Sequence, residues 1–62
     1  MLYLSNILIA NQDVETFDEL KQLVRAFAQQ GEMFLRLDVK PPYPDTPVDW
    51  EDQLEATFSS RY

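Results

Sequence analysis

An amphipathic helix over residues 16–31 is the feature that most constrains what this chain can fold into. Its apolar residues recur at helical spacing and occupy a single arc of about 140° around the helix axis. They are Phe17, Leu20, Leu23, Val24, Phe27 and Ala28. Thr16 and Glu19 have the T-x-x-E spacing of a capping box, and Gly31 stands where a left-handed residue would end the helix. The segment therefore predicts a helix that packs one side on a core.

The segments on either side of this helix, residues 2–10 and 32–40, favour strands. The first is apolar on both faces that a strand would present, and β-branched Ile7 and Ile9 favour a strand over a short buried helix, which fits the same run. In the second, apolar and polar residues alternate, with Phe34 as the exception on the polar face. Strand, helix and strand in this order predict a βαβ unit with parallel strands and a right-handed crossover.

A proline-rich connector and a second helix follow. Four prolines predict an extended connector over residues 40–47 that cannot continue the second strand. Thr46 is a good N-cap, and Pro47 and Asp49 suit the first turn of a helix over residues 47–59.

An aromatic stripe on this last helix is the first candidate for a functional surface, because Trp and Tyr are typical interface anchors. Trp50, Leu54 and Phe58 recur every four residues, and Tyr62 would extend the row. The helix could cover the sheet face that carries Phe34, which would complete an α/β/α sandwich, or it could reach another chain. A two-stranded sheet is a poor free-standing unit, so we expect a symmetric dimer in which this helix or a strand edge completes the core.

The length and composition narrow the classes of fold and site. Sixty-two residues allow one domain, and a domain of this size has marginal stability. The chain has no Cys and no His, which excludes disulfides and the usual zinc sites. With 45% hydrophobic residues, a well-packed core or self-association remains as the source of stability.

The charge is strongly acidic, with eleven acidic and five basic residues and a net charge of −6. This argues against direct binding of nucleic acid or of an anionic membrane, because both depend on Lys and Arg contacts to phosphate. One acidic cluster lies in and before the last helix: Asp45, Asp49, Glu51, Asp52 and Glu55. Helix capping and solvation of the outer face account for most of it. The alternative is a phosphate mimic that occupies the basic groove of a DNA- or RNA-binding protein.

Other chemistry finds little support in the residue spacing. The D-x-D-x-D-G calcium loop is absent, and no Ser, Thr, Lys or Tyr has an activating neighbour at a recognisable spacing. No targeting signal is visible, and no stretch approaches the roughly 20 apolar residues of a membrane span. We therefore expect no cofactor, no metal and a cytoplasmic location.

Together these patterns predict a small α/β domain over residues 1–62, in the order β-α-β-α, with a two-stranded parallel sheet completed by dimerisation. We expect a non-catalytic module that binds another protein. The expected partner-binding residues are Trp50, Leu54, Phe58, Tyr62 and Phe34. The alternative function is an acidic inhibitor that mimics nucleic acid through the cluster that begins at Asp45.

Overall fold

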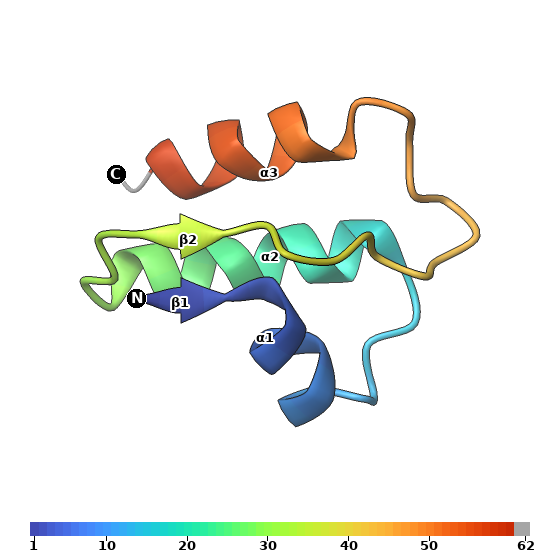
Figure 1. Ribbon diagram of the computed structural model, residues 1–62, viewed down its shortest axis with the longest axis horizontal. Helices are drawn as coiled ribbons and strands as arrows, with labels where there is room; N and C mark the ends of the chain where they lie inside the picture. The colour runs from blue at the N-terminus through green and yellow to red at the C-terminus, as the bar shows by residue number, and fades with distance from the viewer. Residues whose placement is uncertain (61–62) are drawn as a thin grey trace.

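The structure is a computed structural model that describes residues 1–60. Its elements follow in the order β1 (Leu2–Tyr3), α1 (Leu4–Ala10), α2 (Phe17–Gln29), β2 (Leu35–Arg36) and α3 (Trp50–Ser59). β1 and β2 pair in parallel, as the sequence predicted. α2 and α3 lie side by side in one layer, and the sheet lies in front of α2 in Figure 1. The fold is thus a mixed α/β arrangement of two layers.

The predicted central helix is confirmed as α2, together with both of its end signals. The Thr16 side chain accepts a hydrogen bond from the Glu19 amide at 3.2 Å, and the Glu19 carboxylate accepts one from the Glu15 amide at 3.2 Å. Gly31 has a φ of 103°, in the left-handed region where a Cβ is unfavourable. The end signals at Thr16, Glu19 and Gly31 are local in sequence.

The predicted strand over residues 2–10 is wrong beyond Tyr3, because the chain turns into helix α1. Leu4 and Ile7, three residues apart, are both buried on one side of this helix, whereas Ile9 is exposed. A strand would have placed Ile7 and Ile9 on the same face. The element order is therefore β-α-α-β-α rather than β-α-β-α.

The first turn of α1 is held by a residue far along the chain. One carboxylate oxygen of Asp38 accepts a hydrogen bond from the Ser5 amide at 3.1 Å, and the other accepts from the Ser5 hydroxyl at 2.6 Å. At the other end, the Asn11 side-chain amide donates to the Ile7 carbonyl at 2.9 Å. The residue that satisfies the start of α1 is thus separated from it by 33 positions.

The predicted strand over residues 32–40 is reduced to Leu35–Arg36. Leu2 lies opposite Leu35 and Tyr3 opposite Arg36 in the ladder. Because β1 ends at Tyr3, the chain after Arg36 has no strand to pair with. The alternating residues 37–40 therefore lie outside the sheet.

The last helix begins at Trp50, three residues later than the sequence predicted. The Thr46 hydroxyl does not cap it but donates to the Pro41 carbonyl at 3.2 Å, within the connector. Asp49 occupies the N-cap position, and its side chain makes no capping hydrogen bond.

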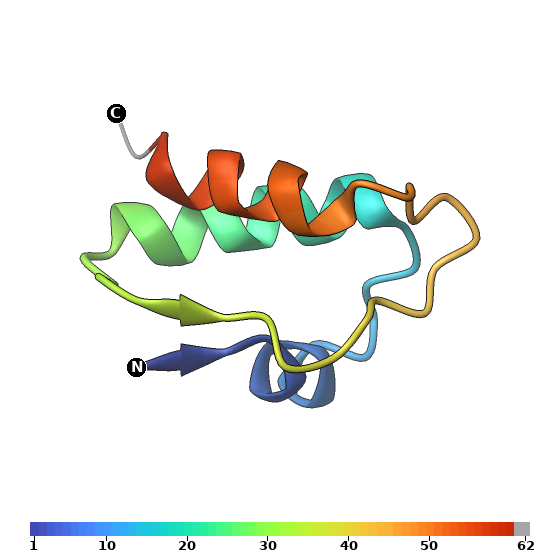
Figure 2. The ribbon, with the colours of Figure 1, turned by 45° about the horizontal axis from the view of Figure 1, so that its top comes forward.

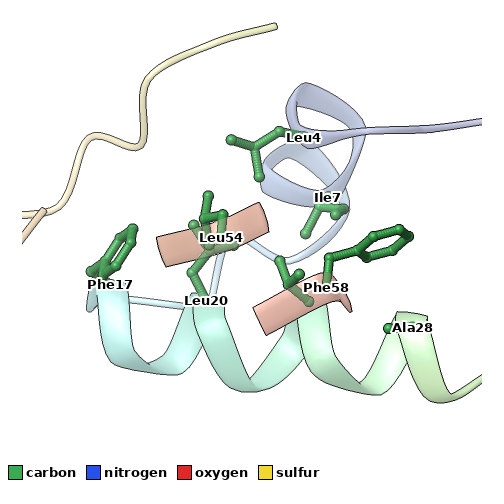
Figure 3. Packing of buried hydrophobic residues seen from close by; sticks show 8 residues of the cluster. Leu4, Ile7, Phe17, Leu20, Ala28, Leu54 and Phe58 are labelled. Atoms are coloured by element: carbon green, nitrogen blue, oxygen red, sulfur yellow. The ribbon is translucent and has the colours of Figure 1, made fainter. Parts of the chain in front are cut away.

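The core lies between α1, α2 and α3 (Figure 3), where apolar side chains from the three helices meet. Its buried members are Leu4, Ile7, Phe17, Leu20, Val24, Ala28, Leu54 and Phe58. α3 therefore folds back on its own chain, but onto α2 and not over the sheet face that carries Phe34. The α/β/α sandwich considered from the sequence is not formed.

Candidate functional site

The two faces of the parallel sheet have different surroundings. Leu2 and Leu35, paired across the ladder, are half-buried and pack against the core. Tyr3 and Arg36, the next pair, are exposed, as the alternation of a pleated sheet requires. Figure 2 shows both long helices on one side of the sheet. No described helix or strand covers the opposite side, which we call the open face.

Three large apolar residues on the open face form what we call the apolar patch. They are Met1, Tyr3 and Phe34, with exposed fractions of 72, 38 and 65%. Each lies next to Leu2 or Leu35 in sequence, so the alternation of a strand places it on the opposite face. The Leu2 amide donates to the Phe34 carbonyl at 3.0 Å, which holds the backbone of Phe34 beside β1. Aromatic residues and Met are enriched in the contact surfaces of proteins. The apolar patch is therefore a candidate contact surface.

The structure separates the residues that the sequence predicted as one partner-binding stripe. Leu54 is fully buried and Phe58 is 7% exposed, and both belong to the chain's own core. Trp50 is half-buried and packs against the same core. Phe34 is exposed and lies on the sheet instead. Tyr62 lies outside the described residues.

Sequence reasoning found Phe34 and missed its neighbours. Met33 was assigned to a buried face and is 65% exposed. Tyr3 was assigned to a strand covered on both sides, and Met1 to no element. The signal that could have found them is the combination of a parallel pair with a single covering layer of helices, which leaves one sheet face without a cover. Only the tertiary arrangement gives that information.

The predicted acidic residues divide into two kinds. Asp45 accepts a hydrogen bond from the Phe17 amide at 2.7 Å and so satisfies the first turn of α2 from 28 residues away. Asp49 accepts from the Gln53 side chain at 2.9 Å. Among residues 1–60, by contrast, the exposed carboxylates of Glu51, Asp52 and Glu55 make no hydrogen bond or ion pair.

The charge of the described chain is concentrated on one side of the fold. Residues 13–29 and 45–59, which include α2 and α3, carry nine carboxylates and two cations, a net charge of −7. Residues 32–40, which include β2, carry two carboxylates and two cations and are neutral. The open face of the sheet therefore has little net charge of its own, whereas the helical layer is strongly acidic.

A shallow hollow of about 350 Å³ lies between α2 and α3. Its lining is polar: Asp18, Lys21, Gln22, Arg25, Ala26, Gln29 and Thr57. Four of these side chains are engaged within the chain. Gln22 donates to Asp18 at 3.2 Å, Lys21 donates to the Gln53 side chain at 3.3 Å, and the Thr57 hydroxyl donates to the Gln53 carbonyl at 2.8 Å. The hollow holds no pairing of a nucleophile with a general base.

Within residues 1–60, two ionisable groups have displaced pKa values. The hydrogen bonds from the Ser5 hydroxyl and the Ser5 amide hold the pKa of Asp38 below its ordinary value. Burial raises the pKa of Tyr43, and the nearby carboxylate of Glu19 adds to the effect. The Asp38 carboxylate contacts the first turn of α1, and Tyr43 packs against the core. Both pKa shifts therefore come from contacts that hold the fold together.

The described part of the chain contains no candidate metal site and no candidate membrane span. No group of three or more His, Cys, Asp or Glu side chains in residues 1–60 is arranged to hold a metal ion. No helix there is both long enough and apolar enough to cross a membrane.

Comparison with known proteins gives no family and no similar protein for this chain. No protein-family model matches the chain, and no curated protein or solved structure is significantly similar to it.

Proposed function

We propose that this chain is a non-catalytic module that binds another protein through the apolar patch on the open face of its sheet. The observation that carries this proposal is a parallel sheet covered by helices on one face only. Parallel sheets occur almost entirely with both faces covered. An exposed group of large apolar side chains on a small folded domain is typical of an interaction site.

The contact surface in this proposal differs from the aromatic stripe on α3. A partner that took up Leu54 or Phe58 would have to open the core, because both side chains are buried against α1 and α2. Phe34 needs no such rearrangement, since it is 65% exposed. Phe34 is therefore the residue we expect to contribute most to partner binding, with Tyr3 beside it across the sheet.

Site-specific photo-crosslinking tests this proposal. A benzophenone amino acid at position 34 is expected to crosslink to a partner protein in a lysate of the source cells, and mass spectrometry would identify it. The matched control is the same probe at position 48, because Val48 is fully exposed and lies outside the apolar patch. Equal labelling from both positions, or no partner from position 34, would contradict the proposal.

A second candidate function is supported by the charge distribution. The helical layer and its flanking turns carry a net charge of −7, which would suit an inhibitor that occupies the basic groove of a nucleic-acid-binding protein. Of the five carboxylates predicted for this role, Glu51, Asp52 and Glu55 make no hydrogen bond within residues 1–60, so these three are available to act in this way. Asp45 and Asp49 are already engaged in hydrogen bonds.

The two functions respond to salt and substitution in opposite ways. A mimic should lose its partner when Glu51, Asp52 and Glu55 are changed together to Gln, Asn and Gln, and when salt is raised to about 0.5 M, where the Debye length is only a few ångströms. A partner bound through the apolar patch should survive both changes and be lost with Phe34→Ser. The same captured protein, tested against both variants, decides between the two functions.

A further inference from the structure

We infer that the protein bound by the open face presents an Asp or Glu carboxylate among its apolar contact residues, and that Arg36 binds this carboxylate. The inference rests on the proposed function in using the same face of the sheet. It gives the partner a chemical signature, an acidic side chain surrounded by apolar ones. Arg36 then determines which apolar surfaces this chain binds.

Arg36 lies inside the surface that a partner of the apolar patch would cover. It is opposite Tyr3 in the parallel ladder, and strand alternation puts it on the same face as Phe34, two residues earlier. Adjacent strands are about 4.8 Å apart, and alternate residues of one strand are about 7 Å apart. A partner that covers Tyr3 and Phe34 therefore also removes water from the Arg36 side chain.

The Arg36 guanidinium has no acidic partner within the described chain. Arg36 is exposed, and its side chain makes no hydrogen bond or ion pair among residues 1–60, although the chain has eleven acidic residues. The nearest carboxylate in sequence is that of Asp38, and both of its oxygens accept hydrogen bonds from Ser5. The N–H donors of the guanidinium are thus available to a group outside the chain.

A carboxylate is the group that best fits a covered guanidinium at this position. Without an acceptor, the covered guanidinium would be an uncompensated buried charge, which strongly opposes binding. A carboxylate accepts two parallel hydrogen bonds from the guanidinium and balances its charge. A phosphate fits the same fork, but its second negative charge would remain unbalanced beside a chain of net charge −6.

Peptide selection tests the inference before the natural partner is known. A phage-displayed library of random peptides is selected on the immobilised wild-type chain, and binders that Phe34→Ser also retains are removed. The remaining peptides should combine aromatic or aliphatic residues with at least one Asp or Glu. Long-range attraction to a chain of net charge −6 would enrich Lys and Arg instead, so an enrichment of acidic residues reports a local contact.

Fluorescence anisotropy with one selected peptide then tests Arg36 directly. Arg36→Gln should weaken binding by at least about tenfold. Replacing the acidic residue of the peptide by its amide should weaken binding to the wild-type chain equally and binding to Arg36→Gln little further, because both changes remove one interaction. Arg36→Lys should give a smaller loss than Arg36→Gln, since it keeps the charge and loses only the planar fork.

Arg25→Gln is the matched control. It makes the same change in net charge at an exposed Arg on α2, outside the open face, so binding should stay within about twofold of wild type. Circular dichroism would establish that the variants are folded. Equal losses from Arg25→Gln and Arg36→Gln would overturn the inference, because the net charge alone would then explain the effect.

The remaining outcomes separate this inference from the proposed function. Peptides that depend on Phe34 but carry no acidic residue, or whose binding does not change with Arg36→Gln, would overturn the inference and leave the proposed function standing. A library with no peptide that depends on Phe34 would contradict the proposed function itself, and the inference with it.

Discussion

The two faces of the small sheet illustrate two uses of the same residue types. On the inner face, Leu2 and Leu35 pack against the helical core. On the open face, Tyr3 follows Leu2 and Phe34 precedes Leu35, and both are exposed. A strand alternates its side chains between faces, so one step along the chain separates a residue that stabilises the fold from one that is free to bind.

This difference teaches where stability and binding should be sought in the molecule. Residues on the covered side should affect the free energy of unfolding and leave association unchanged as long as the chain is folded. Residues on the open face should affect association and leave the free energy of unfolding nearly unchanged. Residues whose side chains hold a helix start from far along the chain, such as Asp38 and Asp45, should have intermediate effects on stability. The following substitutions test this order.

The largest effect is expected on the covered side, for Leu54→Ala. Leu54 is fully buried in the core, and such truncations cost about 2–5 kcal/mol. That is comparable to the roughly 3–9 kcal/mol expected for the whole stability of a 62-residue domain. Urea denaturation followed by circular dichroism should therefore show a variant that is largely unfolded or nearly so. A midpoint equal to that of the wild type would contradict the assignment of α3 to the chain's own core.

A smaller effect is expected for Asp45→Ala. Asp45 accepts a hydrogen bond from the Phe17 amide at 2.7 Å, and the loss of a capping carboxylate costs about 1 kcal/mol. The matched control is Asp52→Ala, since Asp52 is exposed and has no hydrogen-bond partner in residues 1–60. If the same denaturation experiment gave equal losses for the two variants, Asp45 would have no special role in α2.

The contact between Asp38 and Ser5 should appear in the pH dependence of stability. Because the folded-state pKa of Asp38 is lowered from its ordinary value of 3.8, its contribution to stability is present above that value. The contribution is lost as the pH falls through the lower, folded-state pKa.

Asp38→Asn therefore provides the comparison. The free energy of unfolding of the wild type should fall more steeply below about pH 4 than that of Asp38→Asn, since the other carboxylates are common to both proteins. Parallel curves would show that the hydrogen bonds from Ser5 contribute nothing in solution.

The smallest effect on stability is expected on the open face, for Phe34→Ser. Phe34 is 65% exposed, and substitutions at exposed positions usually change stability by less than about 0.5 kcal/mol. The measurement should be made at low protein concentration, where self-association does not contribute. A loss as large as that for Leu54→Ala would mean that Phe34 belongs to the core and is not available for binding.

How much of the fold could be predicted from the sequence depended on where each element's end signals lie. α2 was predicted almost to the residue because its end signals are local: Thr16 is its N-cap, Glu19 lies in its first turn and Gly31 follows its last turn. α1 was read as a strand because the carboxylate at its first turn belongs to Asp38, 33 residues away. Leu4 and Ile7 were visible as apolar residues, but their spacing suits a helix or a strand in so short a run.

The errors in β2 and α3 have the same origin. The length of β2 is set by its partner β1, which ends at Tyr3, and no local pattern in residues 32–40 contains that limit. The hydroxyl of Thr46, a good helix cap by residue type, is engaged by the Pro41 carbonyl. Hydrogen-bond competition of this kind depends on the folded path of the connector and is not encoded in the capping signal itself.

For the candidate site, too, only the features with a local signal could be predicted from the sequence. Phe34 was identified because it interrupts a polar face, which is a local signal. The assignment of Leu54 and Phe58 to partner binding rested on a periodic stripe, and a stripe fits the chain's own core as well as a partner's. The structure resolves this ambiguity by placing both residues against α1 and α2.

The most direct test of the central claim, that the open face of the sheet is the binding surface, is an amide NMR titration with the partner protein captured by crosslinking. Addition of the partner should move the amide signals of Tyr3, Phe34 and Arg36, while those of Glu51, Asp52 and Glu55 on the outer side of α3 stay fixed. Signals that move on α3 and not on the sheet, or that do not move at all, would contradict the account.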